Sequence, residues 1–132
     1  MKNEGYVAEW MKRARSNLER AKVGRISDAI MYEDLCFDCQ QAAEKSIKAL
    51  LISRDKKFPP IHSIAGLLEI VADAGIDVPQ SIQEAVILTD YAVKTRYPGE
   101  GEPVTKEEYE ESVDLAIAVY DWVCKIIEGE DS

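Results

Sequence analysis

Apolar residues recur every three or four positions along most of this chain, and this helical spacing constrains the fold more than any other feature. One stripe steps by four, three, four, four and three residues through Tyr32, Cys36, Cys39, Ala43, Ile47 and Leu50. Such spacing predicts helices with one apolar face, and no segment alternates as a half-buried strand does. We therefore predict an all-α fold: an antiparallel up-and-down bundle of four main helices plus one short helix.

The first two helices have recognisable end signals. A first apolar stripe begins at Trp10 and ends before Gly24, a residue type that often terminates helices. Ser27 is a candidate cap for the second helix, since its hydroxyl can accept a backbone hydrogen bond. That helix should run to about Arg54 and stop before Pro59, because residues preceding proline avoid the helical region.

The later helices also have start and end signals in the sequence. A shorter helix is expected over residues 63–74, with Gly75 as its terminator. Serine or threonine followed three residues later by glutamate is the capping-box pattern, and it occurs at Ser81–Glu84 and Thr105–Glu108. The first box predicts a helix ending near Arg96, and the second predicts a long final helix.

Length and composition indicate one globular domain spanning residues 1–132, with 46% hydrophobic and 31% charged residues. No apolar stretch approaches the ~20 residues that cross a membrane, and the first residues do not resemble a signal peptide. We therefore expect a cytoplasmic protein that does not associate with membranes.

The cysteines favour a reduced protein without a metal. Three cysteines are an odd number, which argues against a disulfide framework. Cys36 and Cys39 make half of a zinc signature, and neither Cys124 nor His62 has a spacing that completes it. We expect these thiols to be small buried side chains, and we assign no metal site and no cofactor.

The net charge of -9 is unevenly distributed. Residues 1–98 contain fourteen acidic and fourteen basic side chains, whereas residues 99–132 contain eleven acidic and two basic ones. Six of the cations lie between Trp10 and Arg25. This basic helix and the acidic last helix can attract one another within a bundle or between subunits, or the basic helix can bind phosphates; the first interpretation is favoured.

Two groups of polar residues are candidates for ligand binding. Gln41, Glu44, Lys45 and Lys48 share one side of the second helix. The alternative is a solvated surface on which Glu44 and Lys48 form an i,i+4 ion pair.

Arg96 and Tyr97 form the second group, because they occur where a helix gives way to a Pro-Gly loop. There an arginine can hold a phosphate and a tyrosine can stack on a base. Alternatively, Arg96 caps helix carbonyls or pairs with Asp90 or with the acidic last helix.

Several catalytic devices are missing from the sequence. Neither glycine-rich phosphate-binding motif occurs, and His62 is the only histidine. We interpret His62 as a structural or capping residue, because no nucleophile or acid partner lies near it in the sequence.

Three segments, Cys39–Leu51, His62–Leu68 and Tyr91–Pro98, resemble the HEPN family, small helical domains named for nucleotide binding in higher eukaryotes and prokaryotes. The resemblance implies a helical bundle that forms a homodimer and works on nucleotides or RNA. It also implies a minimal nucleotidyltransferase as partner, in a toxin–antitoxin pair.

The nuclease branch of that family has a histidine four to six residues after an arginine that matches Arg96. Here those positions hold Glu100, Gly101 and Glu102, so the resemblance points to the non-catalytic branch and we assign no catalytic residue. Arg96 would bind phosphate, and Tyr91 or Tyr97 would contact a base. The helix residues Gln41, Glu44, Lys45 and Lys48 would line the same groove if the second and fourth helices are neighbours.

Two alternatives remain at this stage. One is a metal-independent RNase that uses Arg96 and an unidentified base. The other is a purely structural dimeric scaffold.

Overall fold

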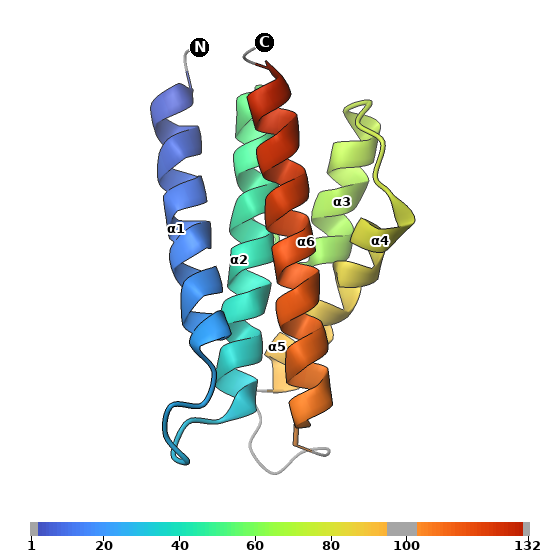
Figure 1. Ribbon diagram of the computed structural model, residues 1–132. Helices are drawn as coiled ribbons and strands as arrows, with labels where there is room; N and C mark the ends of the chain where they lie inside the picture. Colours follow the sequence, from blue (N-terminus) through green and yellow to red (C-terminus); the bar gives the residue numbers. More distant parts are fainter. Residues whose placement is uncertain (1–2, 95–102, 131–132) are drawn as a thin grey trace.

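The computed structural model describes residues 3–94 and 103–130, and this part of the chain contains helices and connecting turns but no strand. The helices are α1 (Glu4–Val23), α2 (Tyr32–Ser53), α3 (Ile64–Asp73), α4 (Gln80–Gln83), a 3-10 turn η1 (Glu84–Val86), α5 (Ile87–Lys94) and α6 (Lys106–Glu130). Figure 1 shows α1 running opposite to α2 and α6, with α3, α4 and α5 gathered on one side of the long helices. The predicted all-α class is confirmed.

Helix α2 is the centre of the molecule, since it packs against α1, α3, α5 and α6. The predicted stripe forms its core face, and the side chains of Cys36, Cys39, Ala43, Ile47 and Leu50 are fully buried. All but Cys36 pack with apolar residues of the surrounding helices, including Leu18, Leu67, Leu88 and Val119. Burial of these side chains supplies most of the stabilisation, as expected for an amphipathic bundle.

The ends of α1 and α2 lie where the sequence predicted them, but α2 begins later than predicted. Gly24 follows α1 with a φ of 79°, a conformation that glycine adopts without strain. Helix α2 reaches Ser53, as expected, but it begins at Tyr32 rather than at Ser27. The Ser27 hydroxyl instead accepts a hydrogen bond from the Ala29 N–H at 3.1 Å. The prediction of a Ser27 cap was wrong because this local turn satisfies the side chain.

Helix α3 agrees with its prediction. The Ser63 hydroxyl caps it by accepting the Gly66 N–H at 2.9 Å, and Gly75 follows the helix with a φ of 89°. Ile64, Leu67 and Val71 are fully buried. Ser63, at the start of this helix, also lies at the site described below.

The two predicted capping boxes have different outcomes. Thr105 and Glu108 form theirs: the Thr105 N–H donates to Glu108 at 2.9 Å, and the Glu108 N–H donates to the Thr105 hydroxyl at 3.1 Å. Ser81 does not act as a cap, because α4 begins at Gln80 with Pro79 as its N-cap residue. The single fourth helix predicted from Ser81 is instead α4, η1 and α5 in succession, and its predicted end at Arg96 lies outside the described residues.

Within residues 3–94 and 103–130, none of the helices combines the length and the apolar character that a bilayer crossing requires.

Candidate functional site

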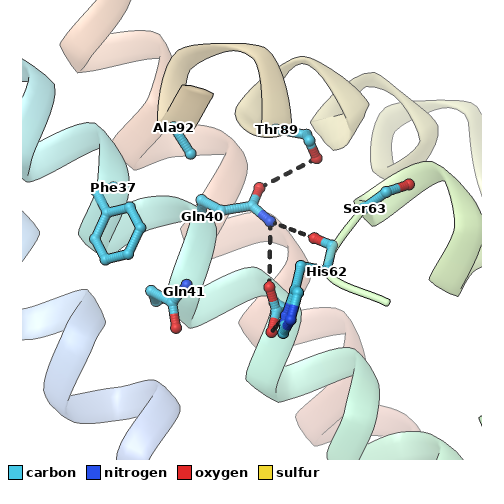
Figure 2. Close-up of a pocket in the computed structure, with 8 residues that line it drawn as sticks. Phe37, Gln40, Gln41, His62, Ser63, Thr89 and Ala92 are labelled. Carbon is cyan, nitrogen blue, oxygen red and sulfur yellow. Dashed lines mark hydrogen bonds and ion pairs between the residues drawn. The ribbon is translucent and has the colours of Figure 1, made fainter. Parts of the chain in front are cut away.

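A cavity of about 240 Å³ lies where α2, the start of α3 and α5 meet. Figure 2 shows its lining side chains around the open space. The lining residues are Phe37, Gln40, Gln41, Glu44, His62, Ser63, Thr89 and Ala92. The contact between α2 and α5 fulfils the condition that the second and fourth predicted helices be neighbours.

Glu44 is the charged group of this cavity, and only 4% of the residue is exposed. The Lys48 Nζ donates to its Oε2 at 2.9 Å, one helical turn along α2. The His62 Nδ1 lies 3.1 Å from the same oxygen. A buried carboxylate requires such partners, because its desolvation is costly when it is unpaired.

Lys48 is itself buried, with 6% of the residue exposed. Its ammonium lies 6.0 Å from the centre of the Trp10 ring and 5.7 Å from that of Phe58. Cation–π attraction and the ion pair with Glu44 together hold this ammonium away from water. The pair therefore puts a negative and a positive charge side by side, with no net charge.

Gln40 connects the three elements that surround the cavity. Its amide nitrogen donates to the His62 carbonyl at 2.8 Å, and its amide oxygen accepts the Thr89 hydroxyl at 3.3 Å. The Thr89 oxygen in turn accepts the Ile64 N–H at 3.1 Å. These bonds, drawn in part in Figure 2, tie α2 to α3 and α5 and give the cavity a fixed polar wall.

A second polar network lies between α1 and α2, away from this cavity. The Lys45 Nζ donates to the Asn17 side chain at 2.7 Å, and Asn17 donates to Asp38 at 3.0 Å. Arg20 lies 3.6 Å from the same aspartate. Burial, with a smaller contribution from Arg13, lowers the pKa of Lys45.

The structure separates the four residues that share one side of α2. Gln41 and Glu44 line the cavity, and Lys48 lies behind Glu44. Lys45 points instead toward α1, where it contacts Asn17. The alternative of a solvated surface is wrong for Glu44 and Lys48, because both side chains are buried, Lys48 beside Trp10 of α1 and Phe58 of the loop before α3, and Glu44 beside His62 of that loop.

Three further predicted residues are not placed at the cavity. Arg96 and Tyr97 lie outside the described residues. Tyr91 is 5% exposed and packs with Cys36 and Val104 in a separate small core, which leaves almost none of its ring for a base to stack on. Burial is the main cause that raises the pKa of its hydroxyl.

His62 has a partner that sequence distance concealed. Its side chain is 73% exposed, while the carboxylate of Glu44, eighteen positions earlier in the sequence, orients its ring through Nδ1. The helix cap that the sequence suggested for this region is Ser63, not His62. The sequence analysis also did not identify Gln40 and Thr89 as residues of the site. The only sequence feature that could have pointed to Gln40 is its i,i+4 spacing from Glu44.

The thiols of Cys36 and Cys39 are fully buried, as expected for small core side chains. Burial raises the pKa of the Cys39 thiol, which disfavours the thiolate that binds metals. Among the described residues, no three histidine, cysteine, aspartate or glutamate side chains are grouped as a metal site would require.

Comparisons with known proteins agree with this geometry. The chain is similar to the crystal structure of TT1696 from Thermus thermophilus, with 34% identity, a TM-score of 0.76, and coverage of 95% of this chain and 98% of that one. It is also similar to the crystal structure of ST0689, described as an archaeal HEPN homologue, with 31% identity, a TM-score of 0.70, and coverage of 92% and 97%. No curated protein shows a significant match. The HEPN domain family matches residues 7–127, so this chain belongs to the HEPN family.

Proposed function

We propose that this HEPN protein is a non-catalytic subunit that binds a nucleotide or RNA in the cavity between α2, α3 and α5. Its family supports a role connected with nucleotides or RNA. The observation that carries the proposal is the buried Glu44 in the wall of a cavity that Gln40 and Thr89 hold in shape. Concave sites with a few fixed polar groups are where small ligands bind.

The size of the cavity limits how much of a ligand it holds. Its volume of about 240 Å³ lies below the ~300 to 1,000 Å³ of sites that enclose drug-sized molecules. A single base fits this space, whereas ribose and phosphates would remain outside. Phe37 offers a ring face for stacking, and Gln41 an amide for the base edge.

Arg96 would bind the phosphates outside the cavity. It follows Ala92, which lines the cavity, by four residues in the sequence. Its planar guanidinium can form two parallel hydrogen bonds with a phosphate, and Tyr97 beside it would stack on a neighbouring base.

The experiment that tests this proposal is a thermal-shift and native mass-spectrometry screen with mononucleotides and short RNAs. A ligand that binds only the folded state raises the melting temperature. We expect a shift that Arg96→Ala abolishes while its own melting temperature without ligand stays unchanged. Arg13→Ala, which removes an exposed arginine of α1, should keep the shift. If no nucleotide or RNA binds, the proposal fails.

We further propose that the protein is a cytoplasmic homodimer and the partner of a minimal nucleotidyltransferase in a toxin–antitoxin pair. The support is the family together with the contrast between a basic α1 and an acidic α6. Co-purification with the product of a neighbouring nucleotidyltransferase gene would support this partnership. A monomer in light scattering would remove the homodimer, and failure to bind that product would remove the partner.

The second candidate function is a metal-independent RNase, and the contact between Glu44 and His62 favours it. A carboxylate at Nδ1 fixes the orientation of the ring and leaves Nε2 for proton transfer. His62 would take the proton of a ribose 2′-OH, whose oxygen attacks phosphorus. The 5′-oxygen would leave with a proton from water, which yields a cyclic phosphate. RNA cleavage that disappears in His62→Asn would support this candidate, whereas no cleavage by the native protein would eliminate it.

A further inference from the structure

We propose that the cavity selects guanine among the nucleobases, through the N–H groups of its Watson–Crick edge. This inference rests on the proposed function and specifies its ligand. It starts from the two carboxylate oxygens of Glu44, which have very different surroundings.

The Oε2 of Glu44 is fully engaged, with Lys48 at 2.9 Å and the His62 ring at 3.1 Å. Among the described residues, the Oε1 receives only the Gln40 amide at 3.5 Å, beyond the usual range of ~2.7 to 3.2 Å for N–H···O bonds. Each carboxylate oxygen can accept about two hydrogen bonds, and buried polar atoms normally find their partners. Oε1 therefore has acceptor capacity for a ligand that brings N–H groups into the cavity.

Lys48 decides what charge that ligand carries. Its ammonium already balances the negative charge of Glu44, so a cationic group entering the cavity would face no net negative charge. It would also be repelled by Lys48, since both charges would be poorly hydrated. A neutral N–H donor encounters no such repulsion. The site thus favours a neutral planar donor, such as a base, over an ammonium or guanidinium group.

Guanine is the base whose edge supplies these donors. Its N1–H and its exocyclic amino group are adjacent donors, and its O6 beside them is an acceptor. Gln41 lines the same cavity, and its amide has no hydrogen-bond partner among the described residues, so it can donate to O6. Adenine would instead turn the lone pair of its N1 toward Glu44, which leaves a buried acceptor facing another acceptor.

Ring stacking and shape are compatible with this orientation. In Figure 2 the ring of Phe37 lies to the left of Gln40 with Gln41 below, and the Gln40 amide points toward Thr89 and His62. Phe37 can cover one face of the base without selecting among bases, because every base has a face that stacks. The choice among bases would then depend on the hydrogen bonds of Glu44 and Gln41.

Calorimetric titration of the native protein with GMP, IMP and AMP tests the inference. Hydrogen bonds to a charged group predict that GMP binds at least about tenfold more tightly than AMP. IMP, which keeps N1–H but lacks the amino group, should fall between them. Equal affinities for GMP and AMP would overturn the guanine inference and leave the proposed function intact. Failure of all nucleotides and RNAs to bind would instead overturn the proposed function.

The variant Glu44→Gln makes a sharper prediction. Lys48 and His62 would hold the new amide by its oxygen, which places an NH₂ donor where Oε1 was. The preference should then shift from GMP toward AMP, whose N1 can accept that donor. The control Glu69→Gln removes an exposed carboxylate of α3 and should keep the preference for GMP. An unchanged preference in a folded Glu44→Gln variant would contradict the inference, and the native titration decides if that variant does not fold.

Discussion

At the residue scale, the site depends on Glu44, which is buried beside one cation and one imidazole. Helical periodicity placed it on the polar side of its helix, and the i,i+4 pair with Lys48 was visible in the sequence. The burial of both residues was not visible, because it arises from α1 and from the loop before α3, which bring Trp10, Phe58 and His62 against them. The contact with His62 spans eighteen residues, and no local pattern reports such a contact.

Replacing Lys48 by methionine tests how strongly the pair is coupled to folding. The substitution preserves most of the side-chain volume but leaves Glu44 buried without its cation. Breaking such a pair costs about 3 to 5 kcal/mol, so urea denaturation should show a loss in this range. The matched change Lys57→Met removes an exposed lysine and should stay within about 0.5 kcal/mol. Equal effects of the two variants would show that the pair contributes nothing to stability.

At the scale of the helices, the same four-residue pattern produced two outcomes. Thr105–Glu108 forms a reciprocal capping box, whereas Ser81–Glu84 does not. Pro79 explains the difference: with φ -60° and ψ 153° it serves as the N-cap residue, so α4 has already begun when Ser81 is reached. The apolar stripes therefore predicted which helices exist, while competing local signals decided where they begin.

The two boxes predict different costs for removing a hydroxyl. Thr105→Ala should destabilise the protein by about 1 kcal/mol, because the Glu108 N–H loses its acceptor at the start of α6. Ser81→Ala should change stability by less than about 0.5 kcal/mol, since its side chain is exposed inside α4. Thermal and urea unfolding of both variants measures this difference. A larger loss in Ser81→Ala than in Thr105→Ala would refute the assigned helix starts.

At the scale of the whole molecule, most ion pairs among the described residues join side chains of the same helix. Arg13 pairs with Glu9 at 3.0 Å and Arg15 with Glu19 at 2.8 Å, all on α1. The interaction of Arg15 with Glu19, and then with Tyr120 of α6, raises the pKa of its guanidinium. Exposed pairs of this kind contribute little to stability. Total charge, its distribution and these i,i+4 spacings could be read from the sequence, whereas the contact of Arg15 with Tyr120 depends on the packing of α1 against α6.

Buried and partly buried phenols and thiols predict how the whole domain responds to alkali. Burial raises the pKa of Tyr91, Tyr109, Tyr120, Cys39 and Cys124. The unfolded chain therefore loses these protons first, near the ordinary values of about 8.5 for cysteine and 10 for tyrosine. Stability should be constant up to about pH 8 and fall above it, because the unfolded state then binds fewer protons.

Lys45 has the opposite effect in this range, because its lowered pKa makes stability rise with pH. It is a single group, whereas the five phenols and thiols all make stability fall. Urea denaturation between pH 7 and about 10.5, with a reductant to keep thiols free, measures the net effect. Constant stability across this interval would contradict the burial of these groups.

The central claim is that a base enters the cavity between α2, α3 and α5, and mapping of backbone amide shifts on titration with GMP tests it most directly. A chain of 14.8 kDa is well suited to such spectra. We expect the largest shifts at residues 37–44, 62–63 and 89–92, which line the cavity. Saturable shifts confined instead to α1 or α6 would contradict the assigned site, and no shifts at millimolar GMP would contradict nucleotide binding itself.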